Sequence, residues 1–176
     1  KDADGQSINM LGTMQSSSQI TDLYFLPDAA YQYITNNSCE NMANLRNAYL
    51  PDSVVAIGKN GFADDPLLTT INLSDNIKHI HDQAFVNWGV AGQVNIARLP
   101  ASLMSLGKLT FYQSGPNVTI TELPPTLVSI GHSCFMACPN VSVNYFGGPD
   151  SALTSVGCQA FYGTAKNAAN IAEIRI

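Results

Sequence analysis

Charged residues are scarce in this chain of 176 residues. Asp, Glu, Lys and Arg together make up 12% of the sequence, about half of the ~25% that is usual for a soluble domain. The formal net charge is -5, which argues against the basic stripe that a nucleic-acid-binding protein needs. Ser, Thr and Asn stand where charges are missing. We therefore expect a neutral, polar surface and no nucleic-acid partner.

Long apolar runs are also missing. No run approaches the ~18 apolar residues of a membrane-spanning helix, and no basic segment followed by an apolar one marks a signal peptide. Hydrophobic residues still make up 45% of the chain, which is enough for one domain with a core. The sequence starts at Lys1 without a Met, so we expect a processed product or a piece of a longer chain.

Catalytic motifs are a third absence. The sequence holds no G-x-S-x-G elbow, no phosphate-binding glycine loop and no C-x-x-C pair. Cys158 and His132 could pair on neighbouring repeats, but a nucleophile also needs a pocket and a third, orienting group. We therefore expect no enzyme and no cofactor.

An internal repeat organises the chain. The copies end in a shared Phe and read LPDSVVAIGKNGF (50–62), LSDNIKHIHDQAF (73–85), LPASLMSLGKLTF (99–111), LPPTLVSIGHSCF (123–135) and SALTSVGCQAF (151–161). Successive Phe residues are 23, 26, 24 and 26 residues apart. An earlier, divergent copy has Cys39 in the Phe position. Such a period lies within the ~20–29 residues of leucine-rich repeats.

A second apolar phrase lies between each Phe and the next Leu. Its alternating β-branched residues predict one strand per repeat. The expected strands lie near 20–26, 45–50, 68–73, 94–99, 118–123, 141–146 and 171–176. The V-x-x-I-G phrase could add a second short strand, and the A-F-x-x-C phrase predicts a helical turn. The shared Phe residues should then stack in one column (Phe62, Phe85, Phe111, Phe135 and Phe161).

Residues 20–176 resemble the BspA-like leucine-rich repeat family, whose repeat reads roughly L-x-x-I-x-I-P-x-S-V-x-x-I-G-x-x-A-F-x-x-C-x-x-L. The resemblance implies an α/β repeat solenoid, with a parallel β-sheet of short strands, helical turns and about six repeats of 23–26 residues. Residues 1–19 would form an N-terminal capping segment. Family members are commonly surface-exposed or secreted and bind partner macromolecules without catalytic residues. The chain departs from the pattern at His81, at Cys39 and at residues 147–150.

The stretch KHIHDQAF (78–85) first suggests a metal site, because His79 and His81 would point to the same side of a strand. Neighbouring repeats, however, offer only Ala, Ser and Gly at these positions, so we expect exposed histidines and no metal. The frame also predicts four free cysteines, of which only Cys158 is exposed. Trp88 is expected in the core.

The outward residues of the predicted strands are the candidate binding site. One residue from each strand forms a ladder across the predicted sheet: Tyr24, Tyr49, Asn72, Asn95, Thr119, Ser142 and Arg175. Three further residues flank this ladder: Arg98, Glu122 and Tyr145. We expect a binding module for an unidentified protein or glycan, in an extracellular, cell-surface or virion location. Two alternatives stay open. The ladder could merely solubilise the sheet, or the chain could be a structural spacer or decoration domain that associates end to end or continues beyond Ile176.

Overall fold

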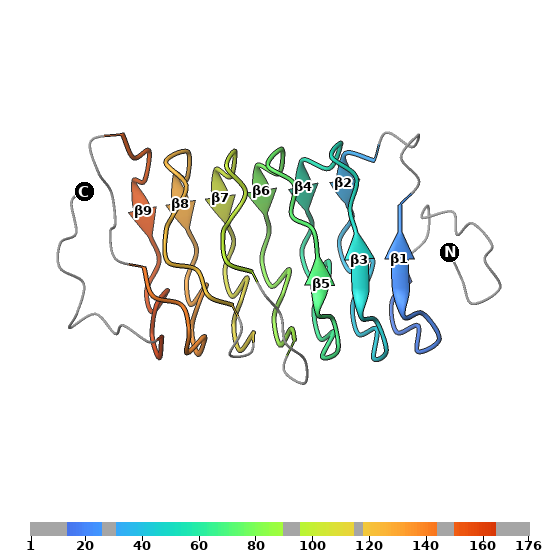
Figure 1. The fold of residues 1–176 in the computed structure, drawn as a ribbon. Helices are drawn as coiled ribbons and strands as arrows, with labels where there is room; N and C mark the ends of the chain where they lie inside the picture. The colour runs from blue at the N-terminus through green and yellow to red at the C-terminus, as the bar shows by residue number, and fades with distance from the viewer. Residues whose placement is uncertain (1–13, 26–30, 90–95, 115–117, 144–149, 165–176) are drawn as a thin grey trace.

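The computed structural model describes residues 14–25, 31–89, 96–114, 118–143 and 150–164. Over these residues the chain winds as a parallel β-solenoid of about five turns. Figure 1 shows the coils side by side, with the strands of successive coils following one another from one end of the molecule to the other. The described ranges contain no helix that is long and apolar enough to cross a membrane.

Each of the first three coils contributes one strand to each of two parallel sheets (Figure 1). The first sheet has the order β1-β3-β5, formed by Asp22–Tyr24, Asn47–Tyr49 and Thr70–Ile71. The second sheet has the order β2-β4-β6-β7-β8-β9, formed by Tyr33–Ile34, Ala56–Ile57, His79–Ile80, Ser105–Leu106, Ser129–Ile130 and Ser155–Val156. The first three coils thus have two strands and not one, and the second short strand that the V-x-x-I-G phrase could add is confirmed and forms the more regular sheet.

The first sheet loses its regularity after β5. Its three strands lie inside the predicted segments 20–26, 45–50 and 68–73. Beyond them the described residues form only an isolated bridge between Ile96 and Val118 and a hydrogen bond from the Ser142 N–H to the Ile120 carbonyl, 2.9 Å long. The apolar spacing changes here from L-x-x-I-x-L to V-x-I-x-x-L, and a shift by one residue turns side chains to the other face of a strand. The strand predicted at 171–176 lies outside the described residues.

The second sheet is held in register by one buried aliphatic residue in each strand except β9. Ile57, Ile80 and Leu106 are paired in successive strands and are at most 2% exposed. The glycine that follows this position has a packing role in the later coils. A Cβ added at Gly131 would overlap with the backbone of Gly107. Gly is therefore required here because two backbones lie too close together for a side chain.

The segments around the shared Phe residues are turns, whereas the sequence predicts helical turns. We call them the Phe turns (residues 35–42, 58–65, 81–88, 107–114, 131–138 and 157–164). Alternate N–H groups donate to the next coil, as from Phe85 to the Thr110 carbonyl at 2.8 Å. The N–H between them stays in its own turn, as from Ala84 to the His81 carbonyl at 3.3 Å. An α-helix would direct all of these groups along its own axis, whereas here alternate groups bond to the next coil, so the predicted helical turn is not confirmed.

Two positions in each Phe turn, four residues apart, have a positive φ. In successive turns the pairs are Asn37 and Asn41, Asn60 and Asp64, Gln83 and Asn87, Leu109 and Gln113, Ser133 and Ala137, and Gln159 and Gly163. The left-handed conformation costs roughly 1–2 kcal/mol per residue for most side chains. The inter-coil hydrogen bonds of the turn offset this cost, and Asn, which tolerates the conformation best after Gly, occupies four of these twelve positions.

The predicted Phe column is confirmed. Its ring centroids lie 5.8, 5.3, 5.4 and 5.2 Å apart from Phe62 to Phe161. Every ring except that of Phe161 is fully buried. Cys39, which takes the Phe position in the first coil, is buried as well.

The predictions for the cysteines and for Trp88 are also confirmed. All four cysteines are free, and Cys158 alone among them is exposed. Burial raises the pKa of the Cys134 thiol well above its usual range and that of the Cys138 thiol to about 11. Trp88 is fully buried, and its ring centroid lies 5.0 Å from that of Phe85.

Candidate functional site

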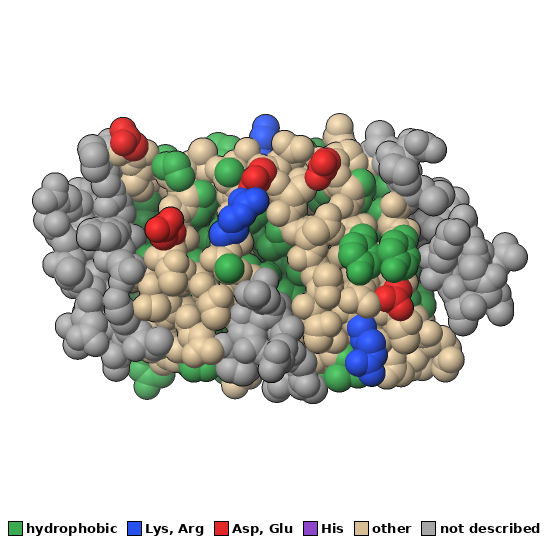
Figure 2. Space-filling view, viewed as in Figure 1, with side chains coloured by type: hydrophobic (Ala, Val, Ile, Leu, Met, Phe, Trp, Pro, Cys, Tyr) green, Lys and Arg blue, Asp and Glu red, His purple; other side chains and the backbone are tan. Residues whose placement is uncertain are grey.

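Two exposed tyrosines meet on the first sheet. Tyr24 on β1 is 53% exposed and Tyr49 on β3 is 39% exposed. They are partners in the strand register, and their rings stack with centroids 4.8 Å apart and planes 12° apart. Figure 2 shows hydrophobic side chains side by side over β1 and β3, on a face that is otherwise mostly polar. The pair thus exposes aromatic surface where β1 and β3 lie side by side.

The parallel register explains why the two rings stack. Leu23 and Ala48 point into the core, so the residues that follow them point outward on both strands. Parallel strands lie ~4.8 Å apart, which is also the spacing at which two aromatic rings stack. Desolvation raises the pKa of Tyr24, and repulsion from Tyr49 and Asp22 adds to the shift. The Tyr24 hydroxyl is therefore a neutral hydrogen-bonding group at physiological pH.

A fixed carboxylate lies on the same strand as Tyr24. Asp22 accepts hydrogen bonds from the Thr21 hydroxyl at 2.6 Å and from the Asn47 side-chain amide at 2.5 Å. These bonds, the one from Thr21 first, lower the pKa of Asp22. Arg46, just before β3, is exposed and acts on Asp22 electrostatically. The site thus combines two phenols with one group of each charge.

Asn72, the next residue of the predicted ladder, has a structural role. Its side-chain N–H donates to the Leu50 carbonyl at 2.7 Å, and its side-chain oxygen accepts the Leu50 N–H at 2.6 Å. The amide thereby imitates a strand pairing just after β5, with both of its polar atoms engaged. It offers a partner little further hydrogen bonding.

The rest of the ladder does not gather around the tyrosines. Thr119 and Ser142 are half-buried, and both lie beyond the point where the first sheet loses its regularity. Asn95, Tyr145 and Arg175 lie outside the described residues. The structure thus brings together the two tyrosines of the predicted set and uses Asn72 to complete the sheet.

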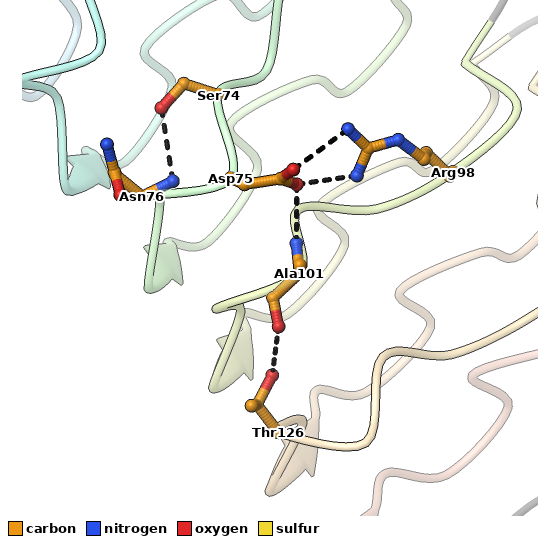
Figure 3. Close-up of polar contacts among 6 residues, drawn as sticks. All are labelled: Ser74, Asp75, Asn76, Arg98, Ala101 and Thr126. Carbon is orange, nitrogen blue, oxygen red and sulfur yellow. Dashed lines mark hydrogen bonds and ion pairs between the residues drawn. The ribbon is translucent and has the colours of Figure 1, made fainter.

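Arg98 is engaged in an ion pair that the sequence did not predict (Figure 3). Its guanidinium nitrogens lie 2.5 and 3.1 Å from the two carboxylate oxygens of Asp75. Asp75 also accepts the Ala101 N–H at 2.8 Å, and the Thr126 hydroxyl donates to the Ala101 carbonyl at 2.8 Å. The contacts thus link three successive coils. Glu122, the other charged flanking residue, is exposed.

The Arg98–Asp75 pair is a surface contact between coils. Its two side chains are 67% and 50% exposed. The hydrogen bond from Arg98, followed by the bond from the Ala101 N–H, lowers the pKa of Asp75. The sequence does show that Asp75 occupies a repeated position. Asp52 takes the same place in the preceding repeat, two residues after its Leu.

The two histidines of KHIHDQAF lie on and beside β6. His81 is exposed as expected, whereas His79 is half-buried because its Nδ1 lies 2.8 Å from the hydroxyl of Ser105 on the next strand. Their ring centroids are 6.3 Å apart. Within the described ranges no group of three or more His, Cys, Asp or Glu residues could hold a metal ion.

The repeated coils and the buried ladder of aliphatic and aromatic residues define a solenoid of the leucine-rich repeat class. The BspA type leucine rich repeat region matches residues 14–142 and 69–175 and is found in six copies. The chain belongs to this family, which is typically non-catalytic. No curated protein matches its sequence.

Three solved structures are similar to the chain. The leucine-rich repeat protein of T. pallidum has a TM-score of 0.52 and 22% identity, over 71% of this chain and 62% of that protein. A leucine-rich cell surface protein from Faecalibacterium prausnitzii has a TM-score of 0.44 and 18% identity, over 90% and 35%. A leucine-rich repeat protein from Bacteroides ovatus has a TM-score of 0.37 and 14% identity, over 81% and 47%. The chain spans less than two thirds of each of these proteins, and the first likeness concerns the fold alone.

Proposed function

We propose that the chain is a non-enzymatic binding module that presents the face around Tyr24 and Tyr49 to a protein or glycan. The stacked, exposed tyrosine pair is the observation that supports this proposal. Tyr is enriched in interfaces because it offers both an apolar surface and a hydroxyl group. The role would be adhesion or recognition at a cell or virion surface, in line with what the BspA-like resemblance implies for location.

The pair is suited to binding because it is already ordered. Each ring limits the rotation of the other, so a partner would find the side chains in place. Binding then loses less side-chain entropy than it would with two independent tyrosines. Asp22 is fixed in the same way by Thr21 and Asn47. The low overall charge favours contacts that depend little on salt.

A binding screen with a matched variant tests the proposal. The chain is applied to a glycan array and to a panel of immobilised extracellular-matrix proteins, beside the double variant Tyr24→Ser/Tyr49→Ser. The control is Tyr33→Ser, since Tyr33 is 61% exposed but lies on β2 of the second sheet. We expect binding that the double variant loses at least tenfold and the control retains. A hit that the double variant binds equally well would contradict the proposal.

A structural role in a larger assembly is the second candidate. Val156 on β9 is 44% exposed, and Tyr162 in the last Phe turn is 64% exposed. Exposed apolar groups in the last described coil favour contact with a further coil or a second molecule. Light scattering with the isolated chain separates the candidates. Self-association that Val156→Lys abolishes would support the structural role, and a monomer at high concentration would contradict it.

A further inference from the structure

Asp65 is a buried carboxylic acid at the end of the second Phe turn. The residue is fully buried. Its Oδ1 accepts the N–H of Met42, on the preceding coil, at 2.7 Å. Its Oδ2 is also buried and has no hydrogen-bond partner among the described residues. A buried acceptor without a partner is unfavourable when neutral and far more so when charged.

The neighbouring coil holds a buried donor that is equally unmatched. Trp88 follows Phe85 by three residues, just as Asp65 follows Phe62, so the two occupy equivalent positions in adjacent Phe turns. The N–H of Gly89, next to Trp88, donates to the Asp65 carbonyl at 3.3 Å. The indole Nε1 of Trp88 is buried and has no hydrogen-bond partner in the described part of the chain. An unmatched acceptor and an unmatched donor thus lie on adjoining coils.

The titratable groups around Asp65 disfavour its charged form. The preceding coil presents Glu40 and the thiol of Cys39, and the same turn presents Asp64. The following coil presents Val86, Asn87 and Trp88, none of which titrates. Burial raises the pKa of Asp65 to about 8, Asp64 and Glu40 add to the shift, and the Met42 N–H opposes it. Asp65 is therefore a neutral acid in the folded protein at neutral pH.

We propose that Asp65 and Trp88 form a pH-responsive contact between adjacent coils. Below the transition the carboxyl is neutral and the indole N–H is left unbonded. Ionisation creates a buried carboxylate, and the indole N–H of Trp88 is then recruited as its hydrogen-bond donor. The recruitment shifts the second and third Phe turns relative to each other.

The direction of the stability change follows from the two protonation states. An unfolded Asp ionises near pH 3.9, whereas folded Asp65 keeps its proton up to about pH 8. Between these values the folded state binds one proton more than the unfolded state, so stability falls as pH rises. The contribution is complete below the unfolded pKa and is lost once pH passes the folded pKa. Alkaline solution therefore loosens this part of the solenoid.

The test uses the fluorescence of Trp88, the sole tryptophan of the chain. Emission of the full chain is followed from about pH 5 to about pH 10, a range that brackets the raised pKa of Asp65. We expect one sigmoidal change with a midpoint near 8 and no such change in Asp65→Asn. A flat emission profile in the unmodified chain, or an unaltered transition in Asp65→Asn, would overturn the proposal.

Control variants distinguish Asp65 from other titrating groups. Asp64→Asn removes the adjacent acid, so the sigmoid should persist with a lower midpoint. The double variant His79→Gln/His81→Gln and the variant Cys158→Ser should keep the midpoint of the unmodified chain. If the transition disappears in either of these, it belongs to an imidazole or to the exposed thiol, and the proposal is wrong.

Infrared spectroscopy tests the same step without depending on the folding of Asp65→Asn. The unmodified chain should show the band of a protonated carboxylic acid at about pH 6, where exposed carboxyl groups are ionised. That band should vanish with the midpoint of the fluorescence change. In Trp88→Phe, which lacks the indole donor, the band should persist to higher pH. Absence of the band at about pH 6, or an unchanged midpoint in Trp88→Phe, would contradict the proposed contact.

Discussion

The ring of Phe111 lies over the ring of Phe135, with centroids 5.4 Å apart and planes that differ by 4°. The spacing is that of adjacent coils, so the aromatic column and the inter-coil hydrogen bonds of the Phe turns run in parallel. Each interior ring is covered on both faces by its neighbours. The column therefore links the stability of each coil to that of the next, as expected in a solenoid.

Replacing Phe111 with Ala should lower the free energy of unfolding by roughly 3–5 kcal/mol, the usual cost of removing a buried aromatic ring. Phe161→Ala is the matched variant, because Phe161 ends the described column and is half-buried. Phe161→Ala should lower the free energy of unfolding by a clearly smaller amount. Urea unfolding followed by circular dichroism measures both. Equal losses at the two positions would mean that the column does not stabilise the interior coils.

Gly131 should tolerate Ala poorly. The added Cβ would meet the backbone of Gly107, which can move only if the two coils separate. The comparison is Gly163→Ala, where the nearest atoms are 3.6 Å away although φ is +72°. That change should cost only about 1–2 kcal/mol, through its conformation. Urea unfolding should show the larger loss for Gly131→Ala, and the reverse order would count against the close coil packing.

The repeat frame predicted the buried positions well, because each apolar position recurs in every coil and must be covered by its counterpart. Phe85 and Ile80 illustrate this. The frame could not predict the conformation of the Phe turns, since the phrase A-F-x-x-C is compatible with a helix when its hydrogen bonds stay local. The conformation of the turn is determined by the next coil, whose carbonyls accept alternate N–H groups. The sequence of a single repeat does not reveal this contact.

The candidate site was predicted only in part, for a similar reason. Tyr24 and Tyr49 are brought together by the strand register, which the frame contains. The role of Asn72 depends on where β5 ends, and that of Arg98 depends on the side-chain direction of Asp75. Neither follows from the position of a residue in the repeat. The burial of Asp65 was not predicted either, because no polar residue was expected in the core.

Thiol reactivity should separate the four cysteines. Cys158 is exposed, whereas the other three are buried, and burial raises the thiol pKa of each of those three. The thiolate is the reactive form. A thiol reagent at about pH 8 should therefore modify one cysteine rapidly in the native chain and all four in denaturant. Rapid native modification of two or more would show that the coils open readily, and Cys158→Ser should abolish the fast phase.

The Arg98–Asp75 pair should matter little to stability. Asp75→Asn removes the charge but keeps an oxygen for the Ala101 N–H, so we expect a much smaller loss than for Phe111→Ala, and less loss at high salt. The lowered pKa of Asp75 determines how the contribution of the pair to stability changes with pH. Its contribution is present above the unfolded pKa of ~3.9 and disappears as pH falls through the folded value. Urea midpoints at low and high salt measure the effect, and a salt-independent loss would point to another cause.

The face that binds can be mapped directly by hydrogen exchange, with the strongest partner from the glycan and matrix-protein panel. If the tyrosine pair is the binding surface, the partner slows amide exchange at residues 22–24 and 47–49. Exchange in the second sheet, at residues 105–106 and 129–130, stays the same. Protection confined to the second sheet would contradict the account, because the stacked tyrosines would then lie away from the contact.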